Sequence, residues 1–322
     1  MLFLNEVTIP KRALIDAALL RRIDPQHPAR REIEDDYHAR MAGYRGEKSL
    51  VYYLKKLPQT KFDIIHGLRL PGENGFFQID TLILSTMFAF VLEVKNMSGI
   101  LHFEKLLDQF IRINPQTNSR ERYQNPILQA EEQSFQLECW MNRNQLGGLP
   151  IEYGFVNSNP KTIITADPGI ESILQKASNS ETVNRKIFVL SQQYRNEIIS
   201  KSALTKIGQQ LLQSHTPPDY SIKEMYHISP HEIRPGVHCP NCFAIPMTYH
   251  RGTWQCFNCQ FTSKTAYIDT IQDYFLLIKP TISNTELRHW LQISSPNIIR
   301  QFIVSMNLPS GGKNKTRIYF QQ

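Results

Sequence analysis

The hydrophobic positions between residues 46 and 95 predict one helix followed by three strands. Leu50, Val51 and Leu54 recur at helical spacing, and Pro58 ends the helix. Apolar runs over residues 62–70, 76–85 and 88–95 are typical of strands, with a Pro-Gly-Glu-Asn-Gly turn after the first. Because the second and third strands are joined by a very short connection, we expect them to pair antiparallel.

Further elements are expected toward the C-terminus. Asn125 suits a helix N-cap and Pro126 the first helical position, in a helix that continues to about Met141. Three more runs, residues 151–156, 162–166 and 186–190, indicate strands, and residues 198–214 indicate a closing helix. We predict a mixed α/β domain over residues 43–215. A helical leader at 1–42 precedes it, and a polar, proline-containing linker at 216–237 follows.

Three charged residues interrupt this apolar strand region: Asp80, Glu93 and Lys95. An unpaired buried charge costs several kcal/mol, so such groups are usually paired, bound to metal or functional. Alternate strand residues share a face, which places Gln78 beside Asp80 and Glu93 beside Lys95 while their neighbours point into a core. If the two strands pair, all three charges meet at one place.

Two interpretations fit these charges. In the first, an Asp/Glu–Lys ion pair lies at the edge of a sheet. In the second, the two carboxylates share Mg²⁺ or Mn²⁺ and the lysine assists hydrolysis of a phosphodiester. The residue pattern alone does not decide between them.

Four stretches, in order, resemble the nuclease-related (NERD) domain of the PD-(D/E)xK nuclease-like superfamily. They are YRGEKSLVYYL at 44–54, FFQIDTLILS at 76–85, FVLEVKNMSG at 90–99 and YQNPILQ at 123–129. QID at 78–80 with EVK at 93–95 matches the acidic signature of the superfamily. The resemblance covers roughly residues 43–141 and implies a restriction-endonuclease-like mixed sheet flanked by helices.

The resemblance also implies roles for individual residues. Asp80, Glu93 and the main-chain carbonyl of Val94 would hold Mg²⁺ or Mn²⁺, and Lys95 would be the catalytic lysine. Glu47 and Gln129 match positions that assist catalysis, and Gln78 matches a polar position that we assign to nucleic-acid contact. Two of these residues have a plain alternative, because the helix dipole favours a carboxylate at Glu47 and Gln129 can simply bond a backbone group.

The cysteines indicate a second site. The pairs CPNC at 239–242 and CFNC at 256–259 are separated by thirteen residues, a spacing typical of a structural Zn²⁺ ribbon, here residues 238–265. The four ligands would be Cys239, Cys242, Cys256 and Cys259. Disulfides and an iron–sulfur cluster are the alternatives. Arg251 and Trp254 lie between the pairs and could contact nucleic acid by stacking on bases, although such ribbons also bind proteins.

Residues 266–322 resemble a winged-helix module. Ser283 and Glu286 have capping-box spacing, Ser295 and Pro296 begin a second helix, and a basic hairpin tip followed by a strand is expected at 311–320. In such modules the second helix enters the major groove and the wing touches phosphates. The candidate nucleic-acid-binding residues are Asn297, Arg300, Gln301, Lys313, Lys315 and Arg317. The alternative is a helical hairpin that docks on another domain or on a second subunit, so a homodimer stays open.

Charge and composition agree with this picture without establishing it. The chain of 322 residues has a net charge of +7 and a pI near 9.1, which fits a nucleic-acid partner. Paired cysteines of this spacing suit a reducing compartment, and the first ten residues do not have the pattern of a signal peptide, so we expect a cytoplasmic protein. The expected activity is metal-dependent hydrolysis of DNA, with RNA as the alternative substrate. The competing expectation is a nucleic-acid-binding or assembly protein that retains the fold without turnover.

Overall fold

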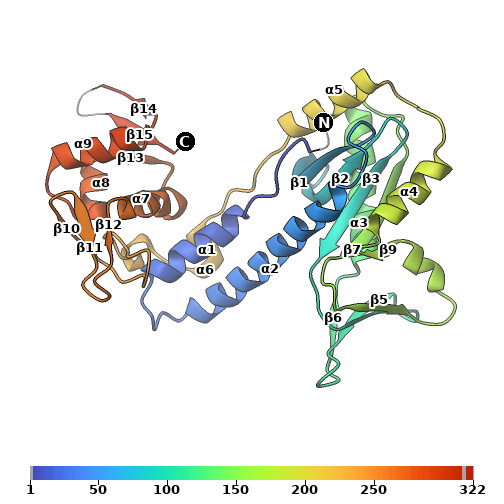
Figure 1. The fold of residues 1–322 in the computed structure, drawn as a ribbon, viewed down its shortest axis with the longest axis horizontal. Coiled ribbons are helices and arrows are strands. Elements are labelled where there is room, and N and C mark those ends of the chain that lie inside the picture. The colour runs from blue at the N-terminus through green and yellow to red at the C-terminus, as the bar shows by residue number, and fades with distance from the viewer. Residues whose placement is uncertain (1–2, 314–316, 322) are drawn as a thin grey trace. The chain divides into compact units, whose positions relative to one another are not determined.

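The computed structural model describes residues 3–313 and 317–321 and divides into two compact units (Figure 1). The first unit contains the residues up to Thr8 together with Ala42–Pro218. The second contains Ile9–Met41 together with the chain from Asp219 onward. Helix α2 (Arg30–Leu54) therefore contributes its first part to the second unit and its last part to the first.

A five-stranded mixed sheet forms the centre of the first unit. Its strand order is β1-β2-β3-β7-β9, from the strands β1 (Asp63–Gly72), β2 (Gly75–Leu84), β3 (Ala89–Lys95), β7 (Ile151–Asn157) and β9 (Ala177–Asn179). The first three strands are antiparallel, whereas β7 and β9 add in parallel. The expected mixed α/β domain and the antiparallel pairing of β2 with β3 are confirmed.

Helices cover both faces of this sheet (Figure 1). On one face, Leu50 of α2 and Ile187 of α4 (Val183–Gln193) pack with Leu92 of the sheet. On the other face, the helices α3 (Pro126–Arg143) and α5 (Lys201–Gln213) bury Leu137 and Leu204 against apolar residues of the sheet. Because successive strand residues point to opposite faces, β2 and β3 supply both cores, which explains their nearly continuous apolar sequence.

The prediction of a strand at residues 186–190 is wrong, because these residues belong to helix α4. Val183 and Ile187, four residues apart, are fully buried, whereas Phe188 is 62% exposed. That burial follows helical periodicity. A short apolar run such as IFVL does not distinguish a strand from a helix, and here the helix forms.

A second sheet of the first unit was not predicted in full. Its order is β6-β5-β4-β8, from β4 (Ile100–Glu104), β5 (Gln109–Ile113), β6 (Arg120–Tyr123) and β8 (Ile163–Ala166). Of these strands, only β8 was expected from the sequence. Phe103 and Phe110 pack with Phe155 of the central sheet, with their ring centroids 6.4 and 5.9 Å from that of Phe155. A 3-10 helix at Glu171–Gln175 precedes β9.

The second unit is built around one hydrophobic core. It contains the helices α1 (Lys11–Arg22), α6 (Ile222–Tyr226), α7 (Ala266–Leu277), α8 (Asn284–Leu291) and α9 (Pro296–Ser305), with a 3-10 turn at Pro230–Glu232. One small sheet has the order β10-β11-β12, from Thr248–His250, Thr253–Gln255 and Thr262–Ser263. Another has the order β13-β15-β14, from Thr281–Ser283, Ile318–Phe320 and Ser310–Gly311. Helices α7 to α9 and this second sheet lie in the stretch 266–322, for which a winged-helix-like module stays a prediction.

The same core includes segments that were expected to belong to separate domains. Leu19 of α1, Trp254 of the cysteine-rich hairpin and Leu287 of α8 all belong to it. So do Ile222 and Val237, which lie in the stretch expected to be a linker. The residues before α2 are helical as expected, but they pack in the second unit and do not form a separate leader.

A buried ion pair joins α1 to α7 within this unit. Arg22 and Asp273 are 0% and 1% exposed, and Arg22 Nε donates to Asp273 Oδ2 at 2.8 Å. The guanidinium also donates to the carbonyl oxygens of Arg234 and Gly236 and lies 4.4 Å from the centroid of the Trp290 ring. The positive charge of Arg22 is therefore compensated by a carboxylate, by two carbonyl oxygens and by the face of an aromatic ring.

Candidate functional site

The structure brings Asp80, Glu93 and Lys95 together, as strand alternation predicts. Strands β2 and β3 are paired as far as Thr81 and Leu92, and Asp80 lies immediately beyond that pair. Its Oδ2 accepts a hydrogen bond from the backbone N–H of Val94 at 2.9 Å. Lys95 Nζ donates to Glu93 Oε1 at 2.5 Å, and the Glu93 side chain is only 3% exposed.

Helix α3 supplies two amides to this ion pair. Gln129 Oε1 accepts from Lys95 Nζ at 3.1 Å, and Gln133 Nε2 donates to Glu93 Oε2 at 2.7 Å. The two glutamines are four residues apart and therefore lie on one face of the helix. Asn125 begins that helix as an N-cap, accepting from the backbone N–H of Ile127 at 3.0 Å. Sequence reasoning identified Gln129 but missed Gln133, which the i, i+4 spacing could have revealed.

The carboxylates of the site are crowded and poorly solvated. Burial raises the pKa of Asp80 well above its ordinary range, and the negative charges of Glu93 and Glu47 raise it further. Burial, and then the charge of Glu93, raise the pKa of Glu47 to about 7. Glu47 thus interacts electrostatically with both Asp80 and Glu93.

The donor set fits a hard divalent cation. Carboxylate and carbonyl oxygens are the ligands that Mg²⁺ and Mn²⁺ prefer. Three carboxylates face a single ammonium, that of Lys95, so a cation would relieve the repulsion that raises the pKa of Asp80. The carboxylates do not form a closed cluster of three. Among the described residues, the four cysteines are the group of three or more metal-binding side chains whose ligand atoms all lie within 4.8 Å of one another.

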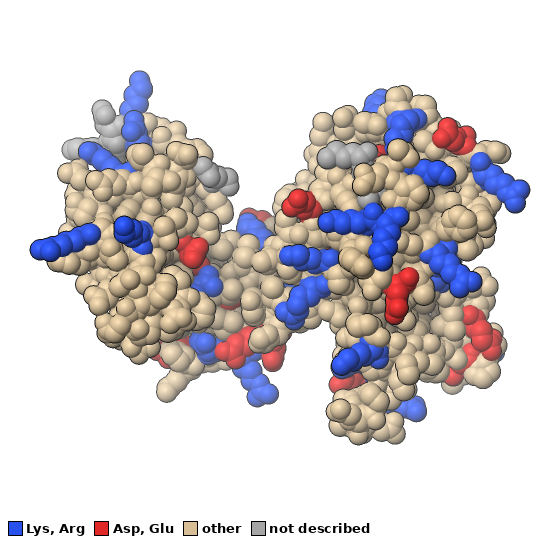
Figure 2. All heavy atoms as spheres, in the orientation of Figure 1, with Lys and Arg blue, Asp and Glu red and all other residues tan. Residues whose placement is uncertain are grey.

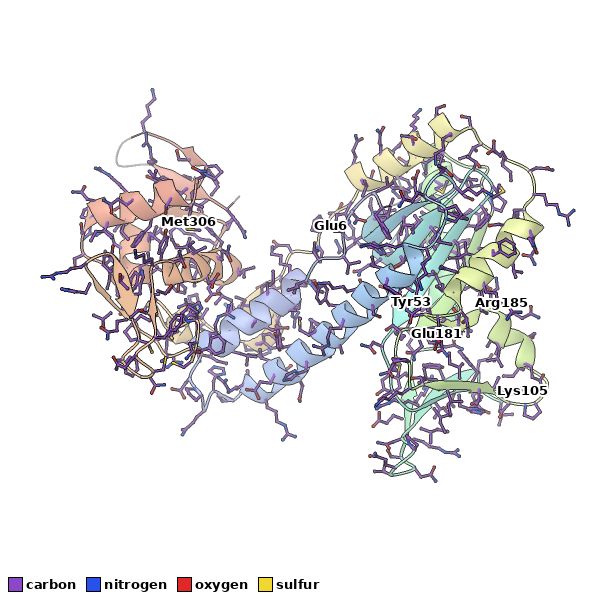
Figure 3. All side chains as sticks on the ribbon, in the orientation of Figure 1. Glu6, Tyr53, Lys105, Glu181, Arg185 and Met306 are labelled. Atoms are coloured by element: carbon purple, nitrogen blue, oxygen red, sulfur yellow. The ribbon has the colours of Figure 1, made fainter. Side chains whose placement is uncertain are left out.

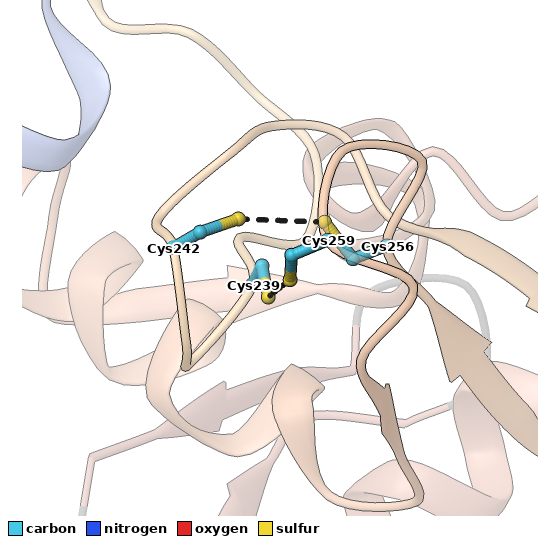
Figure 4. A group of neighbouring side chains, drawn as sticks. All are labelled: Cys239, Cys242, Cys256 and Cys259. Carbon is cyan, nitrogen blue, oxygen red and sulfur yellow. Dashed lines mark hydrogen bonds between the residues drawn. The ribbon is translucent and has the colours of Figure 1, made fainter.

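The two cysteine pairs converge on one point, as Figure 4 shows. The Cys239 and Cys259 sulfurs are 3.6 Å apart, and the Cys242 and Cys256 sulfurs are 3.5 Å apart. All four are free thiols, so the disulfide alternative is not what the structure has. Four sulfur ligands at this separation can hold a metal such as zinc.

Each cysteine pair also sends an asparagine to the other pair. Asn241 Nδ2 donates to Cys259 Sγ at 3.5 Å, and Asn258 Nδ2 donates to Cys242 Sγ at 3.6 Å. The bond from Asn241 and a backbone N–H lower the pKa of Cys259 to about 6, which favours the thiolate that binds metal. The sequence offered a signal for both asparagines, because each holds the third position of its C-x-N-C motif.

The predicted nucleic-acid contacts of the second unit divide into exposed and buried positions. Arg251 is exposed in the β10–β11 turn, and Asn297, Arg300 and Gln301 are exposed on α9. The prediction for Trp254 as a stacking residue is wrong. The indole is 1% exposed because it packs between Tyr249 and Phe302, with centroids 4.9 and 6.2 Å away.

The wing residues are only partly described. Lys313 and Arg317 are exposed, and Lys315 lies outside the described residues. Arg317 and Arg300 border one depression of about 420 Å³ with Val304 and Tyr319, so helix α9 and residues expected to form a wing line the same depression. Figure 2 shows Lys and Arg spread over the visible faces of both units, with fewer Asp and Glu among them.

A mixed sheet that presents two carboxylates and a lysine from neighbouring strands, with helices on both faces, is a nuclease-like α/β architecture. Residues 42–156 match the family model of the nuclease-related domain, so the chain carries a NERD domain over that range. Comparisons with curated proteins and with solved structures find no match. Among the described residues, no helix has the combined length and hydrophobicity needed to cross a membrane.

Proposed function

We propose that the protein is a divalent-metal-dependent nuclease that hydrolyses phosphodiester bonds, with DNA as its substrate. The observation that supports this most is the ion pair of Lys95 with Glu93, which two amides of α3 hold in place beside Asp80. It lies within the residues that match the nuclease-related domain. A purely structural ion pair would not need a second, crowded carboxylate next to it.

Each residue has a distinct part in this proposal. Asp80, Glu93 and the Val94 carbonyl would hold the ion, and Mg²⁺ or Mn²⁺ when bound supplies Lewis-acid stabilisation of charge on a phosphoryl oxygen. The Lys95 ammonium, oriented by Glu93 and Gln129, would donate a hydrogen bond to the attacking water or to a phosphate oxygen. Glu47 has a pKa of about 7 and can exchange a proton near neutral pH.

The second unit would supply nucleic-acid binding. The exposed residues Arg300 and Arg317 border one depression and are suited to contact phosphates, and Asn297 and Gln301 share the exposed part of α9. We assign Arg251, Lys313 and Lys315 to the same role and Zn²⁺ to the four cysteines. Free thiols on all five cysteines suit a reducing cytoplasm, where we place the protein.

A non-catalytic nucleic-acid-binding or assembly protein is the second candidate. The observation that favours it is that Glu93 and Lys95 neutralise each other within 2.5 Å, so the pair is satisfied without metal. Neither form of this second candidate turns over a substrate, which makes cleavage the deciding measurement.

The test uses plasmid, linear and single-stranded DNA and RNA, each with Mg²⁺, Mn²⁺ or EDTA. We expect metal-dependent cleavage by the wild type and a loss of at least a hundredfold in Glu93→Ala and Lys95→Ala. Glu152 and Lys176 offer a matched control. They form a 3.0 Å ion pair that includes a residue of the same sheet, so Glu152→Ala and Lys176→Ala should leave cleavage within about twofold. A wild type that cuts no substrate, or site variants as active as the control variants, would refute the nuclease.

Phosphate contacts in the second unit are tested by binding. We expect Arg300→Ala to weaken DNA binding uniformly across sequences and to lower the salt dependence by about one released counterion. Lys279→Ala is the control, because its ammonium already pairs with Glu286 at 2.6 Å. Equal binding by both variants would remove α9 from the proposed interface.

A further inference from the structure

A pocket of about 530 Å³ adjoins the candidate active site within the first unit. Gln129 and Gln133, the amides that bond Lys95 and Glu93, form part of its wall. The remaining wall comes from Gln78 of β2, the β4–β5 turn, and the segment from β6 into α3. The volume is in the range of pockets that bind small ligands, so a chemical group next to the reacting phosphate could enter it.

Carboxamides dominate the polar lining of this pocket. Six of its twelve lining residues are Gln or Asn. Three of them, Gln78, Gln109 and Gln124, make no side-chain hydrogen bond to any other described residue. A carboxamide both donates and accepts, and so do the edges of nucleobases, so free amides are suited to pair with a base edge.

The apolar lining and the charges indicate the same kind of ligand. Leu107, Leu128 and Tyr123 border the pocket while 68%, 50% and 39% exposed, so they offer apolar surface to a ligand face. The lining includes one cation, Arg122, and two acidic residues, Asp108 and Glu132. A phosphate would find no net positive charge here, whereas a neutral, flat group with polar edges fits.

The turn that presents Leu107 is held firmly. The Glu104 carboxylate accepts hydrogen bonds from the backbone N–H groups of Leu106 at 2.7 Å and Leu107 at 3.2 Å. Asn125 Nδ2 donates to the Asp108 carbonyl at 3.5 Å, which ties the turn to the start of α3. Lys105, labelled in Figure 3, precedes the two leucines in this turn. These bonds give the turn that carries the exposed Leu107 a defined conformation beside the pocket.

We propose that this pocket receives an unstacked nucleobase of the nucleotide next to the bond that is cut. The inference rests on the proposed function for the bond cleavage and adds the class of substrate to it. Because a paired base in a regular duplex cannot leave its stack without cost, the preferred substrate has an unpaired nucleotide at that position. Single strands, mismatches and flaps meet this requirement.

Binding tests the pocket without requiring cleavage. The probes are oligonucleotides that contain 2-aminopurine, whose fluorescence rises on unstacking, either within a full duplex or opposite a mismatch, in Ca²⁺. We expect the wild type to bind the mismatched probe at least fivefold more tightly than the full duplex, with altered fluorescence. Leu107→Ala and Gln124→Ala should reduce that preference about fivefold. Leu106→Ala is the matched control, because Leu106 is 85% exposed in the same turn but does not line the pocket.

The outcomes separate the two proposals. If the wild type cleaves DNA but binds paired and unpaired probes equally, the pocket inference is wrong and the nuclease stands. If it prefers unpaired probes through Leu107 but cleaves nothing, the pocket inference stands and the nuclease fails. If Leu106→Ala and Leu107→Ala reduce the preference for the mismatched probe equally, the pocket inference is also wrong. Such a result would show that the turn as a whole, and not the residue that lines the pocket, determines the preference.

Discussion

The side-chain amide of Gln133 donates to Glu93, with Nε2 2.7 Å from Oε2, across forty residues of sequence. The other Glu93 oxygen accepts from Lys95. Both oxygens of this buried carboxylate therefore have a partner, and Gln133 determines which oxygen faces the lysine. Through this bond, Gln133 acts on the site as a positioning residue for the Glu93 carboxylate.

Replacing Gln133 by Ala would leave one oxygen of Glu93 without its partner. An unsatisfied buried acceptor costs about 1–3 kcal/mol, and loss of a residue that orients a metal ligand typically lowers metal affinity or activity about 10- to 100-fold. We therefore expect Gln133→Ala to raise the Mg²⁺ concentration needed for half-maximal cleavage, measured by titrating the metal at fixed DNA concentration.

Gln136→Ala is the control for that variant, because Gln136 lies on the same helix and bonds only Glu132 within the described residues. It should leave the metal dependence unchanged. A Gln133→Ala protein that loses activity at every Mg²⁺ concentration without a shift in the midpoint would show a structural role and not a positioning role.

The convergence of Asp80, Glu93 and Lys95 could be predicted because it depends on local rules. Strand alternation fixes which side chains share a face, and a short connection makes neighbouring strands antiparallel. The partner from α3 depends on how a helix docks over the sheet, which periodicity alone does not specify. The Gln129–Gln133 spacing showed which residues share a helix face, but not which strand that face meets.

The burial of Trp254 could not be predicted for a related reason. A small ribbon considered by itself has no core, so its tryptophan reads as exposed. Here Trp254 packs on Phe302 of α9, and the ribbon, α1 and α7 to α9 bury one common core. Strand β6 was missed because all four of its residues are exposed and three of them are charged. Strands β4 and β5 are only five residues long and mix polar with apolar residues outside the core, which weakens their strand pattern.

A buried histidine gives the first unit a pH-dependent stability. Burial lowers the pKa of His66 to about 4, and the ring is only 3% exposed. The unfolded chain takes up this proton near pH 6.5, whereas the folded chain does not, so stability falls as pH drops from about 6.5 toward 4 and is constant above that window. At pH 5 the loss from this group is about 2 kcal/mol relative to pH 7.5.

Urea unfolding followed by circular dichroism at pH 7.5 and pH 5.0 checks this expectation. Because other groups also titrate, the wild type is compared with His66→Gln. The free energy of unfolding of His66→Gln should change less between the two pH values than that of the wild type. An NMR titration that places the His66 ring pKa at 6 or above would contradict the prediction directly.

Removal of metal from the cysteine cluster should loosen the core of the second unit. Cys239 and Cys256 are fully buried in the same core as Trp254 and Trp290. A structural zinc site contributes roughly 10–16 kcal/mol to folding in small metal-binding modules. Loss of the ion should therefore expose the core residues that pack around the cysteines. We expect about one zinc atom per chain, and a red shift of tryptophan emission on chelation or in Cys256→Ser.

Cys139→Ser is the matched control, because Cys139 lies outside the cluster, on helix α3 of the first unit. It should keep its zinc and its emission spectrum. If protein prepared without adventitious metal contains far less than one zinc per chain and its emission spectrum is unchanged on chelation, the four thiols do not hold a structural ion.

Arg22 should matter more to stability than its neighbour Arg21, although both pair with Asp273. Arg22 is fully buried and also donates to the carbonyls of Arg234 and Gly236, whereas the Arg21 side chain is 22% exposed and bonds only Asp273 among the described residues. Removing one partner of a buried pair costs about 3–5 kcal/mol, and in Arg22→Ala only the less buried Arg21 would still pair with Asp273 while two buried carbonyls lose their donor. We expect that loss in Arg22→Ala and about 1 kcal/mol in Arg21→Ala, measured by chemical denaturation with tryptophan fluorescence.

The double variant Arg22→Ala with Asp273→Ala should be less destabilised than the sum of its single variants, because the remaining charge is gone. Equal effects of Arg21→Ala and Arg22→Ala, or full additivity in the double variant, would show that this ion pair does not hold α1 against α7.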